Sequence, residues 1–260
     1  MELKVFYTIV IFIFGLIFGS FYNVVGWRLP IGLSIIRPSG SFCPKCKHKL
    51  RWYENIPVFS WLIQGGKCRN CKKKIPKFYI IIEALTGVLF ALSYWIFGFS
   101  FEFVLAILIS SFFVIVVVSD SNFLVIPDEV TLVFSILVIV SRMILNGFND
   151  GVLYLGYGLG AFFVMYLLML FGNFIFKKES LGGGDIKLMF FIGCSLGPWM
   201  SLFTIFLSSF IALPLSLILY FKSKDSVIPY GPFLLIATLI IVIFKMDSNT
   251  VLNFILNMGI

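Results

Sequence analysis

Charge is what this chain of 260 residues has least of. Charged residues make up 12% of it and hydrophobic residues 60%, whereas ordinary soluble domains are roughly 25% charged. A soluble domain of this size could not bury so much apolar surface, and a disordered chain would need far more charge. The composition excludes both classes and leaves a helical membrane protein, because apolar runs of bilayer-spanning length recur along the chain.

Histidine is almost absent as well, since His48 is the single copy. Acid–base chemistry based on histidine, a serine–histidine pair and a metal site of several histidines are therefore nearly excluded. His48 stands beside Cys46 among lysines, where we expect either a solvated loop residue or a group that assists a metal site.

Eight apolar segments predict an all-α, polytopic membrane protein with about eight transmembrane helices. The first is long for a signal sequence and no A-x-A-like cleavage site follows it, so we expect it to be retained. The sixth is short: 12 residues at ~1.5 Å each cover ~18 Å of a hydrocarbon core that is ~30 Å thick. It is therefore either re-entrant or tilted into thinned bilayer. The segments are 5–26, 78–97, 101–118, 130–146, 152–176, 186–197, 199–221 and 227–244.

Positive charge is concentrated in residues 27–77, which hold 12 of the 20 basic residues and one acid, Glu54. Because this charge lies between two spans, the positive-inside rule favours a cytoplasmic loop over a nucleic-acid surface. With eight crossings, 17 of the 20 Lys and Arg residues lie in the cytoplasm and both termini lie outside. We therefore divide the chain into a first transmembrane helix (1–26), a basic loop (27–77) and a transmembrane core (78–260), with the lipid bilayer as partner and no nucleic acid.

Four of the five cysteines form two Cys-x2-Cys knuckles in the basic loop, Cys43 with Cys46 and Cys68 with Cys71. Two such knuckles predict a small zinc-ribbon-like loop, because each directs two sulfurs at one tetrahedral ion. Four protein ligands leave no open position, so we expect the zinc ion to be structural. Cys194, in the apolar sixth segment, is expected to be a small packing residue.

Two aspartates stand where apolar segments meet the cytoplasmic face. Asp120 ends the third segment, where a carboxylate faces the negative end of the helix dipole, so a functional role is favoured. Asp185 closes a Gly-Gly-Gly-Asp tetrad and is equally consistent with an N-cap of the sixth segment. Gly182 and Gly184 would let the backbone lie close to a peptide or another helix. Two carboxylates brought together can share one proton, so that one activates water while the other protonates a scissile carbonyl.

Three further charged residues are supporting candidates. Asp128, just before the fourth segment, is expected to cap a helix. Glu83 lies inside the second segment, where an ionisable group needs either a partner or a protonated state, and Arg28 and Lys187 are the candidate partners. Lys187 is also expected to favour ionisation of the carboxylates near it. Glu83 and the glycine run fit an alternative reading as well, a small transporter or channel with a zinc-knuckle regulatory loop.

Several stretches resemble the type IV prepilin peptidases, the bifunctional leader peptidases and N-methyltransferases of pilus, type II secretion and competence systems. One segment departs from the resemblance: members often carry glycines where this chain has IFLSSFIALPLSL (205–217), so we expect different helix packing there. The matching stretches are FGSFYNVVGWRLP (18–30), CPKCKHKLRWYENIPVFSWL with CRNC (43–71), IIEALTGVLF (81–90), Asp120 with Ile-Pro-Asp (126–128), GGGDIKLM (182–189) and IPYGPFL (228–234).

The resemblance implies a GxGD-type membrane aspartyl protease with Asp120 and Asp185 as its catalytic pair and zinc on the four knuckle cysteines. It implies an enzyme of the bacterial inner membrane that cleaves a short basic leader from a prepilin or pseudopilin at the cytoplasmic face. It also implies N-methylation of the new N-terminus with S-adenosylmethionine, although no residue pattern marks a pocket for that cofactor. Because leader and loop are both basic, we expect acidic groups such as Glu54 and Glu129 to bind the leader.

Overall fold

The structure is a computed structural model of the chain and describes residues 2–37, 40–177, 182–222 and 230–247. Helices are the main structure of these residues, the described part of the long connection 29–76 is mostly irregular, and the described β-structure consists of two isolated bridges. All eight segments predicted as helices are helical in their described parts, and residues 227–229 of the last segment lie outside the described residues. Parts of the expected cytoplasmic loops and the end of the core (178–181, 223–226 and 248–260) lie outside the described residues. The helices are α1 (Glu2–Arg28), α2 (Phe59–Ile63), α3 (Lys77–Phe97), α4 (Phe101–Phe123), α5 (Asp128–Leu145), α6 (Phe148–Phe176), α7 (Gly183–Leu196), α8 (Pro198–Lys222) and α9 (Gly231–Ile243), with short 3-10 turns η1 (Leu29–Ile31) and η2 (Trp52–Asn55).

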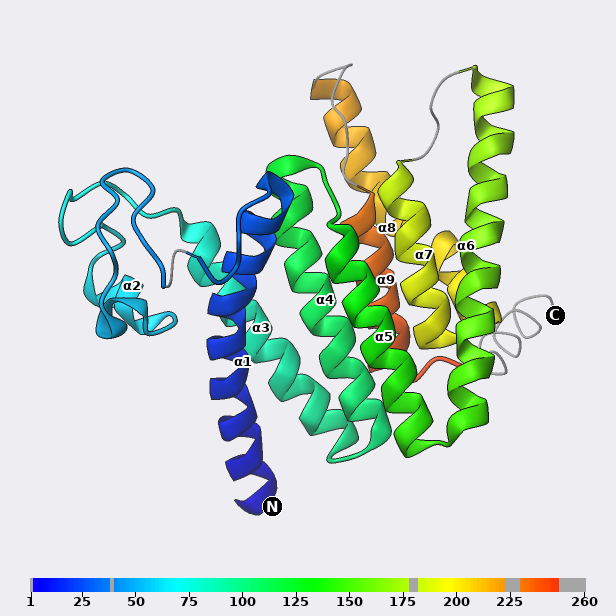
Figure 1. Ribbon diagram of the computed structural model, residues 1–260, viewed down its shortest axis with the longest axis horizontal. Coiled ribbons are helices and arrows are strands. Elements are labelled where there is room, and N and C mark those ends of the chain that lie inside the picture. The colour runs from blue at the N-terminus through cyan, green and yellow to red at the C-terminus, as the bar shows by residue number, and fades with distance from the viewer. Residues whose placement is uncertain (1, 38–39, 178–181, 223–229, 248–260) are drawn as a thin grey trace.

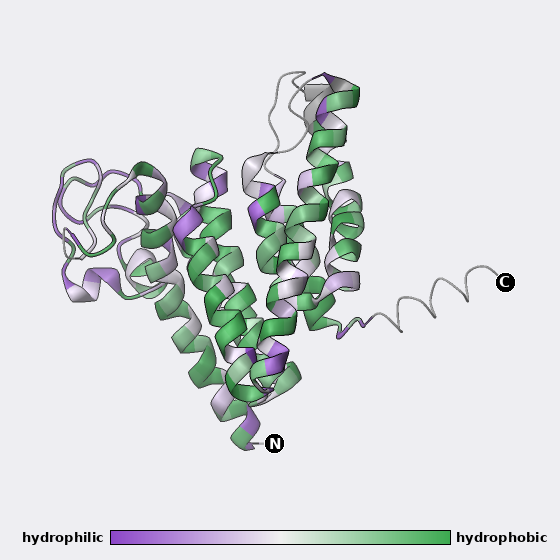
Figure 2. Cartoon of the chain, turned by 45° about the vertical axis from the view of Figure 1, so that its right-hand side comes forward, coloured by the Kyte–Doolittle hydropathy of each residue, from purple (hydrophilic) through white to green (hydrophobic). Residues whose placement is uncertain are grey.

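The long helices run alternately up and down, as Figure 1 shows. The carboxyl ends of α1, α4, α6 and α8 therefore meet the amino ends of α3, α5, α7 and α9 at one end of the bundle. The basic loop lies beside this same end, next to α1 and α3. Its hydrophilic surface contrasts with the apolar flanks of the helices in Figure 2.

Five described helices are long and apolar enough to cross a membrane, namely α1, α3, α4, α6 and α8. Besides the short loop helix α2, three helices remain: α9 has 13 residues and α7 has 14, which at ~1.5 Å per residue is shorter than a hydrocarbon core of ~30 Å. The third, α5, has 18 residues and begins with two acids. The chain is thus a multi-pass helical membrane protein, and the number of eight crossings stays a prediction.

Glycines set how closely α1 packs on its neighbours. A Cβ on Gly15 would lie 2.7 Å from the Cα of Gly87 in α3, so the two backbones touch. A Cβ on Gly26 would lie 2.8 Å from the carbonyl oxygen of Ile115 in α4. Close approach through small residues is the usual basis of helix packing in membranes, where lipid weakens the hydrophobic drive for association. It places α1 against both α3 and α4.

Buried Arg142 of α5 anchors the end of α7 that lies away from the basic loop. Its guanidinium donates to the carbonyl oxygens of Ser195 at 2.6 Å and of Cys194 at 3.3 Å, which are among the last carbonyls of α7. It also pairs with Asp150 at 3.3 Å and lies 3.3 Å from the ring centroid of Tyr154. Cys194 itself is fully buried, as expected for a packing residue.

Residues 205–217, where family members often carry glycines and this chain does not, lie in α8. This helix continues through Pro214. On this segment, the hydroxyl of Ser208 lies 2.6 Å from the hydroxyl of Tyr230, the residue just before α9. The contact ties α8 to the beginning of α9 near the end of the bundle where the basic loop lies.

Candidate active site and metal centre

Asp120 lies one turn before the end of α4. The helix stops at Phe123 because Leu124 adopts a left-handed conformation with φ of 54°, and its N–H donates to the carbonyl oxygen of Asp120 at 3.0 Å. The hydroxyl of Ser119 donates to the carbonyl oxygen of Val125 and holds the chain as it leaves the helix. Among the described residues the Asp120 carboxylate has no hydrogen bond and no ion pair, although its side chain is buried.

Asp185 lies in the first turn of α7, where a carboxylate is favoured by the helix dipole. The expected alternative role as N-cap is wrong, because the cap is Gly182 and no side chain caps this helix. The N–H of Asp185 donates to the carbonyl oxygen of Gly182 at 3.1 Å, which turns the chain into the helix.

The two carboxylates lie at the same point of the bundle, within electrostatic range of each other. Asp120 is 5% exposed and Asp185 is 8% exposed, so little water screens their interaction. Sixty-five residues of sequence separate them, and the packing of α7 beside α4, through α5 and α9, brings them together.

Two glycines make this convergence possible, and both contact Ile126. A Cβ on Gly184 would lie 3.0 Å from Cδ1 of Ile126, so the expectation that Gly184 permits a close backbone approach is confirmed. A Cβ on Gly231, the first residue of α9, would also lie 3.0 Å from this methyl group and 3.5 Å from Oδ2 of Asp120. Sequence reasoning gave no role to Gly231 or Ile126, although a Gly-Pro pair at the start of an apolar segment was a usable signal.

Lys187 and Asp128 form an ion pair that joins α7 to α5 beside the two aspartates. Nζ of Lys187 lies 2.6 Å from Oδ1 and 2.8 Å from Oδ2 of Asp128. The expectation that Asp128 caps α5 is wrong, since Pro127 occupies the cap position without a side-chain bond. Both side chains of the pair are exposed, so it contributes little to stability, about 0–1 kcal/mol.

Glu83 is bonded to the basic loop and not to Arg28 or Lys187, so both expected partners are wrong. Its Oε2 accepts the N–H of Val58 at 2.7 Å, and its carboxylate also bonds the hydroxyl of Ser20. Val58 has φ of 63°, a strained conformation for a β-branched residue. Because Glu83 is occupied by the loop backbone, it lends no support to the reading of the chain as a transporter or channel.

The four knuckle cysteines form one cluster that could hold a metal ion. All four sulfurs lie within 4.8 Å of one another, and Cys43 to Cys71 and Cys46 to Cys68 are each 3.9 Å apart. A tetrahedral zinc ion with ~2.3 Å bonds separates its sulfurs by about 3.8 Å, so the cluster fits such an ion. Together with the helices, the cluster confirms the predicted fold class, a helical membrane protein with a zinc-ribbon-like loop between α1 and α3.

Backbone hydrogen bonds lower the pKa of the Cys46 and Cys68 thiols, whereas at Cys71 the Lys73 N–H is outweighed by burial and the neighbouring sulfurs, which raise the pKa to about 11. In each knuckle the first cysteine donates its N–H across a short hairpin, Cys43 to the carbonyl oxygen of His48 and Cys68 to that of Lys73, both at 2.9 Å. The backbone N–H of His48 lowers the pKa of the Cys46 thiol to about 6, and Nδ2 of Asn70 lies 3.7 Å from the same sulfur. Both contacts favour the thiolate, the form that binds metal.

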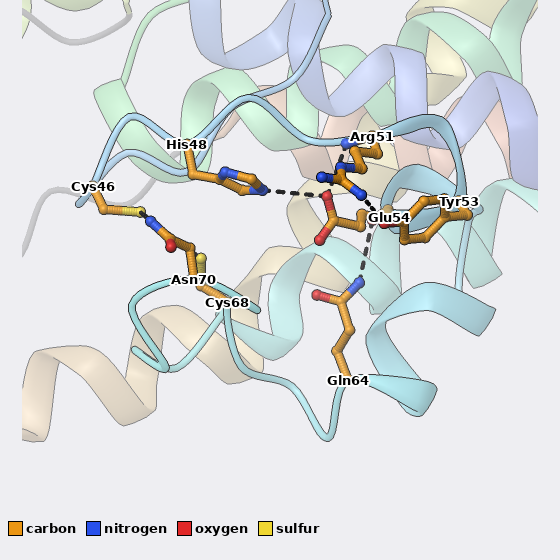
Figure 3. A network of polar contacts seen from close by, with 8 residues as sticks. All are labelled: Cys46, His48, Arg51, Tyr53, Glu54, Gln64, Cys68 and Asn70. Atoms are coloured by element: carbon orange, nitrogen blue, oxygen red, sulfur yellow. Dashed lines mark hydrogen bonds and ion pairs between the residues drawn. The ribbon is translucent and has the colours of Figure 1, made fainter.

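The His48 side chain is turned away from the sulfurs and toward Glu54, as Figure 3 shows. Its Nε2 lies 3.3 Å from Oε2 of Glu54, which also accepts the N–H of Arg51 at 2.9 Å. The Arg51 N–H bond is the main cause that lowers the pKa of Glu54. Glu54 is buried, so it stabilises the loop from inside and does not present its carboxylate on the surface, whereas Glu129 is exposed.

This chain is a helical membrane protein with paired aspartates at one end and a four-cysteine loop beside α1. Its sequence matches the models of two protein families. The family described as bacterial peptidase A24 N-terminal domain matches residues 13–97, and the type IV leader peptidase family matches residues 107–217. These two matches cover the zinc-ribbon-like loop with its flanking helices and the helices that carry both aspartates.

Similarity to individual proteins identifies the family of this chain more closely. The prepilin leader peptidase/N-methyltransferase of Bacillus subtilis is 38% identical over 193 residues, which are 74% of each chain. The protein of the same name from Vibrio cholerae is 32% identical over 254 residues, 90% of this chain and 96% of that one. No solved structure matches the chain. The chain therefore belongs to the prepilin leader peptidase/N-methyltransferase family.

Proposed function

We propose that this protein is an aspartic endopeptidase that removes the short basic leader from a prepilin or pseudopilin, with Asp120 and Asp185 as its catalytic pair. One observation carries the proposal: two buried carboxylates from distant helix ends come within electrostatic range at the end of the bundle beside which the basic loop lies. No histidine lies near these carboxylates in the described part of the chain, so the two aspartates carry out the acid–base steps of the hydrolysis by themselves. The positive charge of the loop supports a site at the cytoplasmic face of the inner membrane.

The pair acts with one carboxylate ionised and one protonated. The ionised carboxylate takes a proton from water as the water oxygen bonds to the scissile carbonyl carbon. The protonated carboxyl gives its proton to the carbonyl oxygen, and the product is a neutral gem-diol. When the C–N bond breaks, the carboxyl that took the proton from water gives it to the leaving nitrogen, a hydroxyl of the gem-diol returns its proton to the other carboxylate, and the products are an amine and a carboxylic acid. Burial of both side chains strengthens each of these electrostatic steps, because the local dielectric constant is low.

For the leader, we propose Glu129 as the acidic contact. Glu129 is exposed at the start of α5, next to Asp128, whose charge is already balanced by Lys187. Glu54, the other expected contact, is buried in the loop. Glu129→Gln should raise KM for a basic-leader substrate without lowering kcat, and an unchanged KM would remove this contact from the proposal.

We also propose that the family's second activity is retained and that the new N-terminus is methylated from S-adenosylmethionine. The four thiolates would hold one zinc ion that has a structural role, since a four-thiolate site leaves no position for substrate. The ion would fix the two knuckles against each other and, through them, the loop beside α1.

Mass spectrometry of a co-expressed prepilin tests both activities at once. The wild-type protein should produce a pilin that lacks its leader and carries the added mass of one methyl group. Asp120→Asn and Asp185→Asn should each lower cleavage at least ~10³-fold while the protein remains folded by thermal unfolding. The matched control is Glu102→Gln, an exposed acid at the opposite end of α4, which should leave cleavage unchanged. Efficient cleavage by either aspartate variant would overturn the assignment.

A further inference from the structure

A cavity of about 320 Å³ separates the basic loop from α1 and α3. It lies on the far side of α1 from the aspartate pair, with α1 and α3 forming its floor and the zinc-ribbon-like loop its wall. This volume is within the range of small-molecule sites, which are mostly apolar with a few placed polar groups. Among its lining residues are Asn23, Trp27, Phe42, Glu54, Trp61, Tyr79 and Glu83.

A polar atom in the cavity floor has no partner. The Nδ2 of Asn23 donates to the carbonyl oxygen of Tyr79 at 3.3 Å, which fixes the orientation of the amide. Among the described residues, none donates a hydrogen bond to the Oδ1 of Asn23, in a side chain that is 4% exposed. A buried acceptor without a donor costs about 1–3 kcal/mol, so a ligand that donates an N–H or O–H there is favoured.

Two carboxylates line the same cavity, although this part of the chain is poor in acids. Glu54 is the only acid among residues 27–77 and Glu83 the only one in α3. Glu54 is already bonded to His48 and to the Arg51 N–H, as Figure 3 shows. Glu83 is half-buried and holds the strained turn at Val58, so its position in the wall is fixed by the loop. Arg28, Lys45, Lys73 and Lys74 also line the cavity, so the lining carries charges of both signs and favours a ligand that has both a cationic and an anionic group.

Aromatic rings supply the apolar part of the lining. Trp27 and Tyr79 come from α1 and α3, and Phe42 and Trp61 come from the loop. The indole Nε1 of Trp61 donates to the carbonyl oxygen of Ile75 at 3.3 Å, which orients this ring. Aromatic faces stack on flat heterocycles and attract cations.

We propose that this cavity is the binding site for the methyl donor S-adenosylmethionine, an inference that rests on the methyl transfer proposed above. The donor combines the features that the lining selects: a flat adenine for the aromatic rings, ammonium and sulfonium cations for the acidic groups, and a carboxylate for the basic side chains. Glu83 serves the cationic part, the aromatic rings serve the adenine, and Oδ1 of Asn23 accepts a hydrogen bond from the ligand. In the transfer, the amine nitrogen forms the new N–CH3 bond, the S–CH3 bond breaks with its electron pair left on sulfur, and the ammonium product loses one proton to solvent.

The site is separate from the aspartate pair but adjacent to it. Trp27 lines the cavity, and its ring centroid lies 6.3 Å from that of Phe123, three residues after Asp120. Donor binding and leader cleavage should accordingly respond to different substitutions.

Equilibrium binding to the purified, zinc-loaded, full-length protein in nanodiscs tests the site. Radiolabelled S-adenosylmethionine and its neutral product S-adenosylhomocysteine are titrated separately, because they differ in the sulfonium charge. Glu83→Gln keeps an acceptor for the Val58 N–H and removes the charge, so it should weaken the donor roughly tenfold and change the product less than about twofold. Asn23→Leu should weaken both ligands, and Glu102→Gln and Asp120→Asn should weaken neither.

Any result other than these overturns the proposal that the donor binds in this cavity. If Glu83→Gln weakens both ligands equally, Glu83 only holds the loop; if it weakens neither, the donor binds elsewhere. Competition by anionic phospholipid headgroups or by a basic leader peptide would assign the cavity to those ligands instead. A wild-type protein that methylates pilin and binds the donor independently of Glu83 and Asn23 leaves the proposed function intact and removes only this site. A wild-type protein that cleaves leaders but neither binds the donor nor methylates removes the methyl transfer and this inference with it.

Discussion

Replacing Arg142 with methionine should destabilise the protein more than any single substitution of a residue exposed on the protein surface. Arg142 is 5% exposed and donates to the carbonyl oxygens of Cys194 and Ser195. These carbonyls belong to the last turn of α7, where no intrahelical N–H is available to them. The substitution keeps most of the side-chain volume and leaves both carbonyls buried without a donor.

The size of the effect follows from these contacts. Each hydrogen bond from a charged group contributes about 1.5–3 kcal/mol, and the stacking on Tyr154 at 3.3 Å adds up to about 2 kcal/mol. Desolvation of the guanidinium offsets part of this sum. Removing one partner from a buried ionic network generally costs about 3–5 kcal/mol, which we adopt for Arg142→Met.

The assay is thermal unfolding of the detergent-solubilised protein, followed by intrinsic fluorescence. A loss of this size should lower the apparent Tm by roughly 10 °C. The matched control is Lys187→Met, which removes a cation from the exposed pair with Asp128 and should change stability by about 0–1 kcal/mol. An equal Tm for Arg142→Met and wild type, or an equal loss in both variants, would refute the reasoning from burial.

Three further predictions concern the site and the loop. Gly231→Val places a branched side chain whose Cβ lies 3.5 Å from Oδ2 of Asp120, so cleavage should fall at least roughly tenfold with a smaller Tm change than for Arg142→Met; a normal cleavage rate would contradict this. Zinc analysis should give one ion per chain, and Cys68→Ser or chelation should lower the affinity for S-adenosylmethionine, since Cys68 lines its proposed cavity; unchanged affinity in the metal-free protein would contradict this. Because the Arg51 N–H lowers the pKa of Glu54, the loop should be stabilised above the unfolded pKa of about 4.3 and lose that stability as the pH falls through the lower folded value. Tryptophan fluorescence of Glu54→Gln should show a weaker loop at neutral pH and less acid dependence than wild type, and identical pH profiles would exclude Glu54 as the source.

The helices could be predicted because each apolar run had only one way to satisfy its backbone in a bilayer. The described parts of all eight predicted segments are helical, and the shortest, 186–197, matches α7 up to Leu196, with Gly197 as the C-cap. Helix ends were less predictable. Asp128 and Asp185 both fit a cap by sequence, but Pro127 and Gly182 occupy those positions. Capping depends on the dihedral angles of one residue, and composition does not reveal them.

Partners of single charged residues were the least predictable feature. Glu83 was expected to pair with Arg28 or Lys187, and it accepts the N–H of Val58 instead. A backbone donor has no sequence signature, because every residue other than proline carries one. Lys187 pairs with Asp128, although 59 positions separate the two residues. Such a contact depends on how α5 and α7 are rotated about their axes.

By itself, the sequence determined the membrane class, the helices, the four-cysteine loop and the concentration of positive charge beside it. These features follow from hydrophobicity and short-range spacing, which act within one segment. The tertiary structure decided that Asp120 and Asp185 meet around Ile126, that Gly231 adjoins them, and that α1, α3 and the loop enclose a cavity. Contacts of this kind depend on the packing of whole helices, because the separation of two side chains on different helices is set by helix rotation and close approach at small residues.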